Sequence, residues 1–275
     1  MSNLDASTVD SFGTEWTLFD QSELKAAEAL QVFNQYFSEF PWQALPSGSR
    51  GFDLGCGSGR WAKLVAARVG ELHCIDASAP ALEVAKKNLR EFDNVKFANA
   101  SVDAIPLDDD SMDFGYSLGV LHHVPDTQAA LSACVRKLKR GAPFLVYLYY
   151  ALDNRPFYFR AAWRASDLVR RWLSRQAPRR REQVSRGIAR TVYWPLARAS
   201  RQLDRMGLDV ERVPLSAYRD LSFYTMCTDA YDRFATPLEQ RFTRSEITEM
   251  MLTAGLRDIR FREGVPYWCA VGIRA

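Results

Sequence analysis

The segment Gly51-Phe52-Asp53-Leu54-Gly55-Cys56-Gly57-Ser58-Gly59 joins a short apolar run to a glycine-rich loop. Its first four residues are predicted to form a buried strand, and residues 60–69 an amphipathic helix. The later glycines therefore lie in the turn between the strand and the helix. Glycine tolerates both a sharp turn and the close approach of a ligand to the backbone. We interpret this loop as part of a binding site.

The sequence around this loop alternates between short apolar runs and amphipathic helices. Such alternation predicts an α/β fold with a parallel sheet and right-handed crossovers. The apolar run at 142–149 is typical of a strand that is buried on both faces. Strands are expected at 51–54, 71–75, 95–98, 112–118 and 142–149, with helices at 60–69, 79–91 and 127–138. Near the end, Thr243 and Glu246 predict a capping box for a helix to Ala254, followed by a closing pair of strands at 258–262 and 267–273.

The chain divides into four expected parts. Residues 1–48 form an N-terminal segment. Residues 1–20 of it are expected to be loosely ordered, with the aromatic anchors Phe12, Trp16 and Phe19. Residues 22–39 are expected to form a helix that Ser22 caps. The core spans 49–150 and is completed by 243–275. Between these two parts, residues 151–242 break the alternation, are helical in pattern and are rich in arginine and aromatic residues. We expect this insertion to lie over the open edge of the sheet as a lid on the acceptor.

An acidic residue accompanies the glycine loop. Asp76 ends the second predicted strand, 21 residues after Gly55, which suits a carboxylate that accepts hydrogen bonds from two ribose hydroxyls. A dinucleotide usually needs the spacing GxGxxG, with its pyrophosphate at the helix N-terminus. Here the glycines are spaced GxGxG, and Asp53 precedes them, which favours a cationic ligand over a pyrophosphate.

Four ordered motifs resemble one known family, the class I S-adenosylmethionine-dependent methyltransferases. Asp53 to Gly59 resembles the signature loop, and Asp76 with Ala77 the ribose-binding acid. Residues 101–113 are similar to the segment that lines the adenine, and 117–126 to the segment after the fourth strand in the small-molecule branch. The resemblance implies a Rossmann-like, doubly wound and mostly parallel sheet of seven strands, the last antiparallel, with an N-terminal helical segment and a helical insertion after the fifth strand.

The resemblance also implies roles for individual residues toward S-adenosylmethionine and its product S-adenosylhomocysteine. The loop would pass the methionine and ribose, Asp53 would lie near the ammonium, and the adenine would meet the backbone N–H of Val102. Ser101 stands where the family often has an aspartate that accepts from the adenine amino group. The cofactor-binding set is Asp53, Gly55, Cys56, Gly57, Gly59, Asp76, Ala77, Ser101, Val102 and Leu118. Trp16 and Phe19 are expected to close over the cofactor.

Methyl transfer to a hydroxyl requires a base near neutral pKa. Of the three histidines, His73 lies inside a predicted strand and is interpreted as structural. His122 and His123 follow the fourth strand, at the edge where open α/β sheets bind ligands, and are the leading candidates; packing or helix entry is the alternative explanation. The family resemblance adds that a comparable histidine pair faces the acceptor in enzymes that methylate sugars. Tyr149 and Asp153, at the end of the fifth strand, are secondary candidates.

The charge is unevenly distributed. The 275 residues carry a net charge of +3, yet residues 155–212 hold 15 arginines and five acidic residues, which leaves −7 for the rest. Such a stretch can bind an anionic acceptor, a membrane surface or nucleic acid, or it can be a solvated helical face. Residues 160–181 interleave arginines with Trp163, Leu168 and Trp172, a composition shared by interfacial helices and by core-packed helices with one wet face.

The sequence also narrows the class of protein. The N-terminus lacks a secretory signal, and no apolar run approaches the ~20 residues of a membrane span, so a cytoplasmic protein is expected. Five widely spaced cysteines indicate buried thiols, with no metal site.

The favoured function is a small-molecule or glycan methyltransferase, most simply an O-methyltransferase. A nucleic-acid methyltransferase is an alternative, although 117–120 lack the Asn/Asp-Pro-Pro-aromatic motif used on base amines. A non-catalytic protein that binds S-adenosylmethionine and a nicotinamide oxidoreductase are the others. The acceptor and the oligomeric state are not encoded in these motifs.

Overall fold

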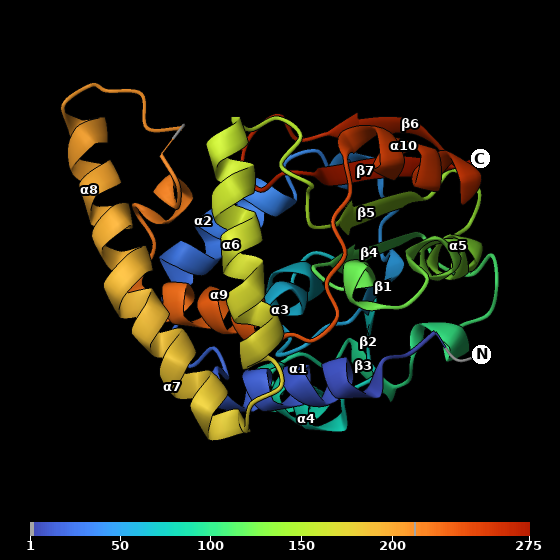
Figure 1. Ribbon diagram of the computed structural model, residues 1–275. Coiled ribbons are helices and arrows are strands. Elements are labelled where there is room, and N and C mark those ends of the chain that lie inside the picture. Colours follow the sequence, from blue (N-terminus) through green and yellow to red (C-terminus); the bar gives the residue numbers. More distant parts are fainter. Residues whose placement is uncertain (1–2, 212) are drawn as a thin grey trace. The chain divides into compact units, whose positions relative to one another are not determined.

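A computed structural model describes residues 3–211 and 213–275, which divide into two compact units (Figure 1). The first unit comprises Met1–Gln21, Ala29–Ala151 and Leu238–Ala275. The second comprises Ser22–Glu28 and Leu152–Pro237. Each is described below by itself.

A seven-stranded sheet forms the centre of the first unit. Its strands are β1 (Arg50–Leu54), β2 (Glu71–Asp76), β3 (Val95–Asn99), β4 (Phe114–Leu118), β5 (Pro143–Tyr147), β6 (Leu256–Phe261) and β7 (Cys269–Arg274). Their order is β3-β2-β1-β4-β5-β7-β6, which Figure 1 shows from bottom to top. The first five strands are parallel, and β7 is antiparallel to both β5 and β6. The expected Rossmann-like sheet of seven strands is confirmed, including its antiparallel last strand.

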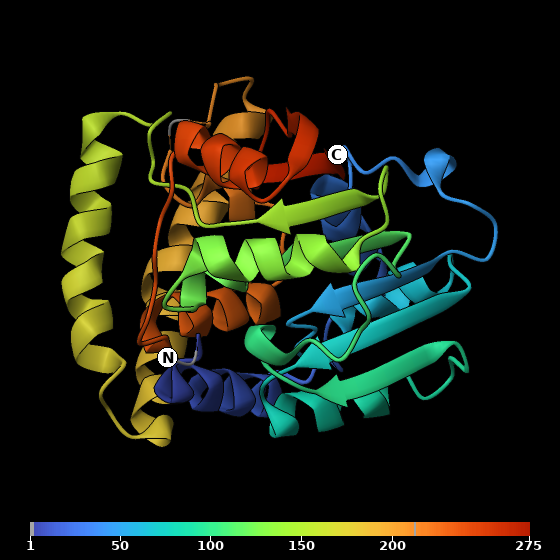
Figure 2. The ribbon, with the colours of Figure 1, turned by 90° about the vertical axis from the view of Figure 1, so that its right-hand side faces the viewer.

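Helices of the first unit bury both faces of this sheet. One face packs against α5 (Thr127–Lys137) and α10 (Arg244–Thr253), and α5 lies in front of the strands in Figure 2. The other face packs against α3 (Arg60–Ala66), α4 (Ala79–Asn88) and the later part of α2 (Ala26–Tyr36). The short helices η1 (Trp42–Ala44), η2 (Val102–Ala104) and η3 (Leu121–His123) lie in the connections. The predicted capping box of α10 is present. The Thr243 side chain accepts from the backbone N–H of Glu246, and the Glu246 side chain accepts from the backbone N–H of Thr243.

Two glycines and two phenylalanines interlock at the centre of the sheet. Gly51 of β1 pairs with Phe114 of β4, and Phe52 pairs with Gly115, so each ring lies over the glycine of the neighbouring strand. A Cβ atom added to Gly51 would lie 2.2 Å from the Phe114 ring, and one added to Gly115 would lie 2.4 Å from the Phe52 ring. Phe52 belongs to the core under α5, whereas Phe114 belongs to the core under α3. The pair therefore fixes the register of β1 on β4 from both faces.

The N-terminal segment differs from the expectation. Residues 1–20 were expected to be loosely ordered, but α1 (Ala6–Leu18) is a regular helix, whose N-cap Asp5 accepts from the backbone N–H of Thr8. Gly13 obscured this helix in the sequence. It lies where α1 meets the start of α4, because an added Cβ would be 2.7 Å from the Ser78 hydroxyl. The next helix also begins later than predicted, at Ala26 and not after Ser22.

The second unit is built from α6 (Phe157–Leu173), α7 (Pro178–Ile188), α8 (Trp194–Arg205) and α9 (Phe223–Ala235). A five-residue π-helical turn, η4 (Ala189–Tyr193), joins α7 to α8, and η5 (Ser216–Tyr218) precedes α9. The N-terminus of α9 is held by Glu28, whose carboxylate accepts from the backbone N–H of Ser222 at 3.0 Å and from the Thr225 hydroxyl at 2.6 Å. The role of this unit as a lid stays a prediction.

The remaining sequence expectations concern membranes and cysteines. Within residues 3–211 and 213–275, no helix has the length and apolarity needed to cross a bilayer. All five cysteines are buried and free of disulfides, as expected. His73 lies in β2 with its Nε2 2.7 Å from the Glu71 carboxylate on the same strand, and its structural role stays a prediction.

The interlocked pair predicts a steric penalty at Gly115. We expect Gly115→Ala to lower the free energy of unfolding by about 1–3 kcal/mol or more, because the Phe52 ring is held in a packed core and must move. Gly264→Ala is the matched control, since an added Cβ there meets only the Arg262 side chain at 3.6 Å. Urea unfolding of both variants measures the difference. Equal stability of the two variants would contradict the interlock.

Candidate functional site

The glycine loop leaves the carboxyl end of β1 and turns sharply into α3. The backbone N–H of Gly55 donates to the carbonyl of Ile75 at 2.7 Å, and that of Gly59 donates to the carbonyl of Cys56 at 2.8 Å. Gly59 has a φ of 76° and immediately precedes the first residue of α3. The loop therefore leaves the strand and enters the helix without a side chain on its turning residues.

Gly57 shows why the middle of the loop needs glycine. Its φ is 53°, in the left-handed region that other residues avoid. An added Cβ would lie 2.7 Å from Nε1 of Trp16, which comes from α1. The guanidinium of Arg60 lies 5.5 Å from the ring centre of Trp16 and 4.3 Å from that of Trp61. Trp16 thus lies directly against the loop, and its closure over the cofactor stays a prediction.

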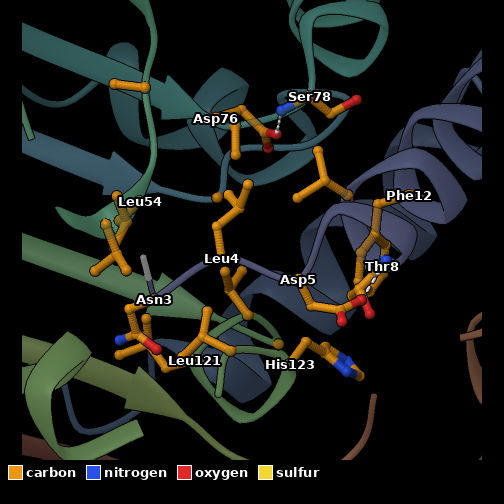
Figure 3. A pocket seen from close by; sticks show the side chains of 18 of the residues that line it. Asn3, Leu4, Asp5, Thr8, Phe12, Leu54, Asp76, Ser78, Leu121 and His123 are labelled. Carbon is orange, nitrogen blue, oxygen red and sulfur yellow. Dashed lines mark hydrogen bonds between the residues drawn. The ribbon is translucent and has the colours of Figure 1, made fainter. Parts of the chain in front are cut away.

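Asp76 holds this loop to the end of β2. One carboxylate oxygen accepts from the backbone N–H of Gly57 at 2.8 Å, and the other accepts from the backbone N–H of Ser78 at 2.8 Å (Figure 3 shows the second bond). Burial raises the pKa of Asp76, and the two backbone hydrogen bonds oppose this shift. Each oxygen of a carboxylate can accept more than one hydrogen bond, so the pair can also bind hydroxyl groups.

A pocket of about 790 Å³, part of it open to solvent, lies against Asp76. Its walls come from the carboxyl ends of β1, β2 and β4, from the connections that follow them, and from the N-terminal segment (Figure 3). Of the predicted cofactor residues, the pocket is lined by Gly55, Asp76, Ala77, Val102 and Leu118.

The other predicted cofactor residues lie outside the pocket lining. Gly57 and Gly59 shape the loop through their backbone, while Cys56 is buried in the core under α3. Ser101 precedes η2, and its neighbours Ala100 and Val102 line the wall in its place. Their binding roles stay predictions.

The N-terminal strap, residues 3–5, was missed by the sequence analysis. The side-chain amide of Asn3 donates to the carbonyl of Asp126 at 2.7 Å, and its oxygen accepts from the N–H of Asp126 at 2.7 Å. The backbone N–H of Asn3 also donates to the carboxylate of Asp103. These bonds hold Leu4 and Asp5 at the pocket wall (Figure 3). A polar chain start carries no periodicity, so only its contacts reveal it.

Asp53 lies behind the loop and is only 1% exposed. Its Oδ2 accepts no hydrogen bond from any described residue. Burial raises the pKa of Asp53 to about 8; the neighbouring Tyr116 and Arg60 act in the opposite direction, while Asp76 raises it further. Asp53 is absent from the pocket lining, so a direct contact with a ligand ammonium stays a prediction.

The two candidate histidines have different surroundings. His123 lines the pocket, its ring lies edge-on to Phe12 at 5.0 Å, and its Nδ1 lies 2.6 Å from the carbonyl of Leu238. His122 is fully buried, and no described residue bonds either of its ring nitrogens. Burial, with His123 and Arg241 nearby, holds the pKa of His122 well below its usual range, so its imidazole is neutral at pH 7.

Tyr149 extends this group away from the pocket. Its ring stacks on His122, with centres 3.9 Å apart. The guanidinium of Arg241 lies 5.1 Å from the Tyr149 ring centre and is 2.8 Å from the buried carboxylate of Glu239. Arg241 was counted in the insertion by the sequence analysis, but it belongs to the first unit. Asp153, the other secondary candidate, belongs to the second unit.

Comparisons with known proteins identify the central part of the chain. Residues 52–146 match the sequence model of a family described as a methyltransferase domain. The chain is 32% identical over 107 residues to the uncharacterized methyltransferase YcgJ of Bacillus subtilis, which covers 38% of this chain and 42% of that protein. It is 36% identical over 96 residues to a ubiquinone biosynthesis O-methyltransferase of Alkalilimnicola ehrlichii, which covers 34% of this chain and 39% of that protein. The chain thus spans less than half the length of these relatives.

One solved structure covers almost the whole chain. A chain from the complex between the Haloferax volcanii Trm112 methyltransferase activator and a methyltransferase superposes with a TM-score of 0.53 and 16% identity. The match covers 97% of this chain and 96% of that chain. At this identity, the likeness concerns the fold alone.

The burial of Asp53 predicts a specific dependence of stability on pH. Between about pH 4 and pH 8 the folded protein holds a proton on Asp53 that the unfolded chain has released, so the free energy of unfolding falls as pH rises. Asp53→Asn keeps the neutral shape and should flatten this slope, gaining a few kcal/mol near pH 8. Thermal unfolding from pH 5 to pH 8 measures the effect. The exposed Asp93→Asn is the control, and a parallel slope in the Asp53 variant would contradict the shift.

Proposed function

We propose that this chain, in which residues 52–146 form a class I methyltransferase domain, transfers the methyl group of S-adenosylmethionine to a hydroxyl of a small organic acceptor. The single observation that carries the proposal is the contact between Asp76 and the glycine loop. A carboxylate with spare acceptor capacity thus lies beside a glycine-rich stretch of backbone, at the wall of a pocket.

The pocket fits the parts of this cofactor. Asp76 accepts from the ribose hydroxyls while it holds the loop, and Ala77 gives the sugar room. Val102 and Ala100 bound the adenine, with the backbone of η2 as the hydrogen-bonding edge. Gly55 and Leu118 bound the methionine part. The strap residue Leu4 and the α1 residue Phe12 cover the nucleoside from the outside.

The chemistry needs little from the protein beyond position. The bound cofactor supplies an electrophilic methyl group on a sulfonium, a good leaving group for an in-line displacement. The protein holds the acceptor oxygen in line with that methyl group, which can provide much of the acceleration. A hydroxyl acceptor also loses a proton during the transfer.

His123 is the base in this proposal. Its Nδ1 lies 2.6 Å from a carbonyl oxygen, which can only accept, so Nδ1 carries the proton. In the neutral form of the ring the lone pair is therefore on Nε2, which is the atom that would accept the proton. His122 is neutral and enclosed, and it positions His123 and Tyr149 by packing between their rings.

The relatives support a small acceptor. They include the ubiquinone biosynthesis O-methyltransferase, demethylmenaquinone methyltransferases of Staphylococcus aureus and a phosphoethanolamine N-methyltransferase of Caenorhabditis elegans. Phe12 and His123 give the pocket wall two aromatic rings, against which a flat, hydroxylated ring can lie. A quinol-like or phenolic hydroxyl is therefore the proposed acceptor group, with a glycan hydroxyl as the second choice.

Calorimetry with S-adenosylhomocysteine tests the cofactor site. We expect S-adenosylhomocysteine to bind to the wild-type chain. The affinity of Asp76→Ala should be at least about 100-fold lower, because this change removes the hydrogen bonds to two hydroxyl groups and the bond that holds the loop. The affinity of Trp16→Ala should fall by a smaller factor. The exposed Asp93→Ala should bind as the wild type does. If the wild-type protein binds NADH and ignores S-adenosylhomocysteine, the proposal is wrong.

The base is tested by the pH dependence of turnover. S-adenosylhomocysteine release is measured with a panel of catechols, hydroquinones and simple sugars. For the wild type, the rate should rise with pH until the base has lost its proton. His123→Ala should no longer show this rise of the rate with pH, and its rate should be about 100-fold or more lower. Its affinity for the cofactor should be unchanged. An unchanged rise in this variant would remove His123 from the mechanism.

A further inference from the structure

One face of α6 carries apolar side chains that no neighbouring helix of the second unit covers. Phe157 is 77% exposed, Leu168 is 68% exposed and Trp172 is 49% exposed. With the exposed Ala161 and Ala165, these residues recur at helical spacing along one stripe. Large side chains of this kind are normally buried, so a stripe of them on one helix marks an interaction surface.

The opposite face of α6 is the one that packs within its own unit. Asp167 and Arg170 are buried there, with Nε of Arg170 at 2.7 Å from Oδ1 of Asp167. Arg170 also donates to the carbonyls of Thr236 and Pro237, which follow α9. The apolar stripe is thus not the inward face of a core-packed helix, the alternative that its composition left open.

Exposed arginines lie along one side of the stripe and beyond its C-terminal end. Between residues 155 and 181 the sequence has nine arginines, and its one acidic residue is Asp167. That acid is buried and already paired with Arg170 and, at 2.8 Å, with Arg171. The exposed guanidinium groups along α6 and just after it belong to Arg160, Arg164, Arg171, Arg175, Arg179 and Arg180. The stripe is therefore bordered by positive charge, with no exposed acid of the same segment to neutralise it.

We propose that α6 adsorbs on an anionic lipid membrane, with its axis in the plane of the interface. An interfacial helix buries aromatic and aliphatic side chains at the boundary of headgroups and acyl chains, while arginines on its flanks bind lipid phosphates. The Phe157–Leu168–Trp172 stripe and its arginine border supply both halves of this interaction.

The same charges disfavour the other occupants. A second copy seated on the stripe would bring two arginine borders together without exposed acids on α6 to pair with them. A nucleic acid would neutralise the arginines but leave Phe157 and Leu168 in water. A membrane of anionic lipid can bury the apolar stripe and neutralise the arginines at the same time. This adsorption is independent of the proposed methyl transfer.

Vesicle sedimentation tests the proposal with the full chain. Vesicles of phosphatidylcholine alone are compared with vesicles in which phosphatidylglycerol replaces about a third of the lipid. We expect wild-type protein to sediment with the anionic vesicles only, and added salt to weaken binding. Equal behaviour with both vesicle types, or no binding to either, would overturn the proposal.

Three variants separate the two halves of the surface. The apolar variant replaces three side chains of the stripe, Phe157→Ser, Leu168→Ser and Trp172→Ser. The charge variant neutralises three arginines beside it, Arg160→Gln, Arg164→Gln and Arg175→Gln. The control removes the same amount of charge from exposed positions of the first unit, through Arg90→Gln, Arg140→Gln and Arg260→Gln. We expect at least tenfold weaker binding for the apolar variant and about fivefold per removed arginine for the charge variant. The control should bind within about twofold of the wild type, since only overall charge changes. Circular dichroism verifies that each variant is folded.

Two further readouts distinguish the occupants. Lipids brominated in the acyl chain should quench part of the wild-type tryptophan fluorescence, and Trp172→Phe should lose that part while still binding. Light scattering should show the same mass for the wild type and the apolar variant without lipid. A wild-type dimer that the apolar variant dissociates, or salt-sensitive RNA binding without vesicle binding, would assign the surface to another partner and overturn the proposal.

Discussion

The carboxylate of Asp76 is the group on which the arrangement of the site depends. It ends β2, yet it bonds the backbone of the loop that follows β1 and the N–H of Ser78 before α4. A single side chain thus ties two strand ends and the start of a helix at one edge of the sheet. The contact also explains why the loop needs glycine at position 57, because the backbone must approach Asp76 on one side and Trp16 on the other. The pocket is the space that this arrangement leaves.

The sequence predicted the sheet well because its signals are local. Each strand of the parallel core is short, apolar and bounded by a turn, so the strands expected at 71–75 and 95–98 differ from β2 and β3 by a single residue at one end. The strand expected to start at Met112 begins at Phe114, since Met112 makes only an isolated bridge to Leu138. The helix α1 was missed because Gly13 lowers helix propensity, and its reason for being there is a contact with α4 that lies far along the chain.

The candidate site was predictable to the same degree. Motif residues such as Asp76 and Val102 line the pocket, because strand ends gather at one edge of a parallel sheet. The two adjacent histidines could not be distinguished from the sequence, since one residue of spacing sends their rings to different surroundings. Asn3 and Arg241 carry no motif, and their roles come from contacts with segments more than 90 residues away in the chain. Tertiary contacts of that kind leave no trace in local periodicity.

The strap formed by residues 3–5 has a practical consequence for handling the protein. The side-chain amide of Asn3 pairs with the backbone of Asp126, and Leu4 forms part of the pocket wall, so the strap lies at the proposed ligand site. A purification tag fused ahead of Asn3 would place foreign polypeptide beside the ligand and compete for the same backbone groups. At the other terminus, Ala275 only extends the pairing of the sheet edge toward Gly255. Tags and immobilisation chemistry therefore belong at that end of the chain.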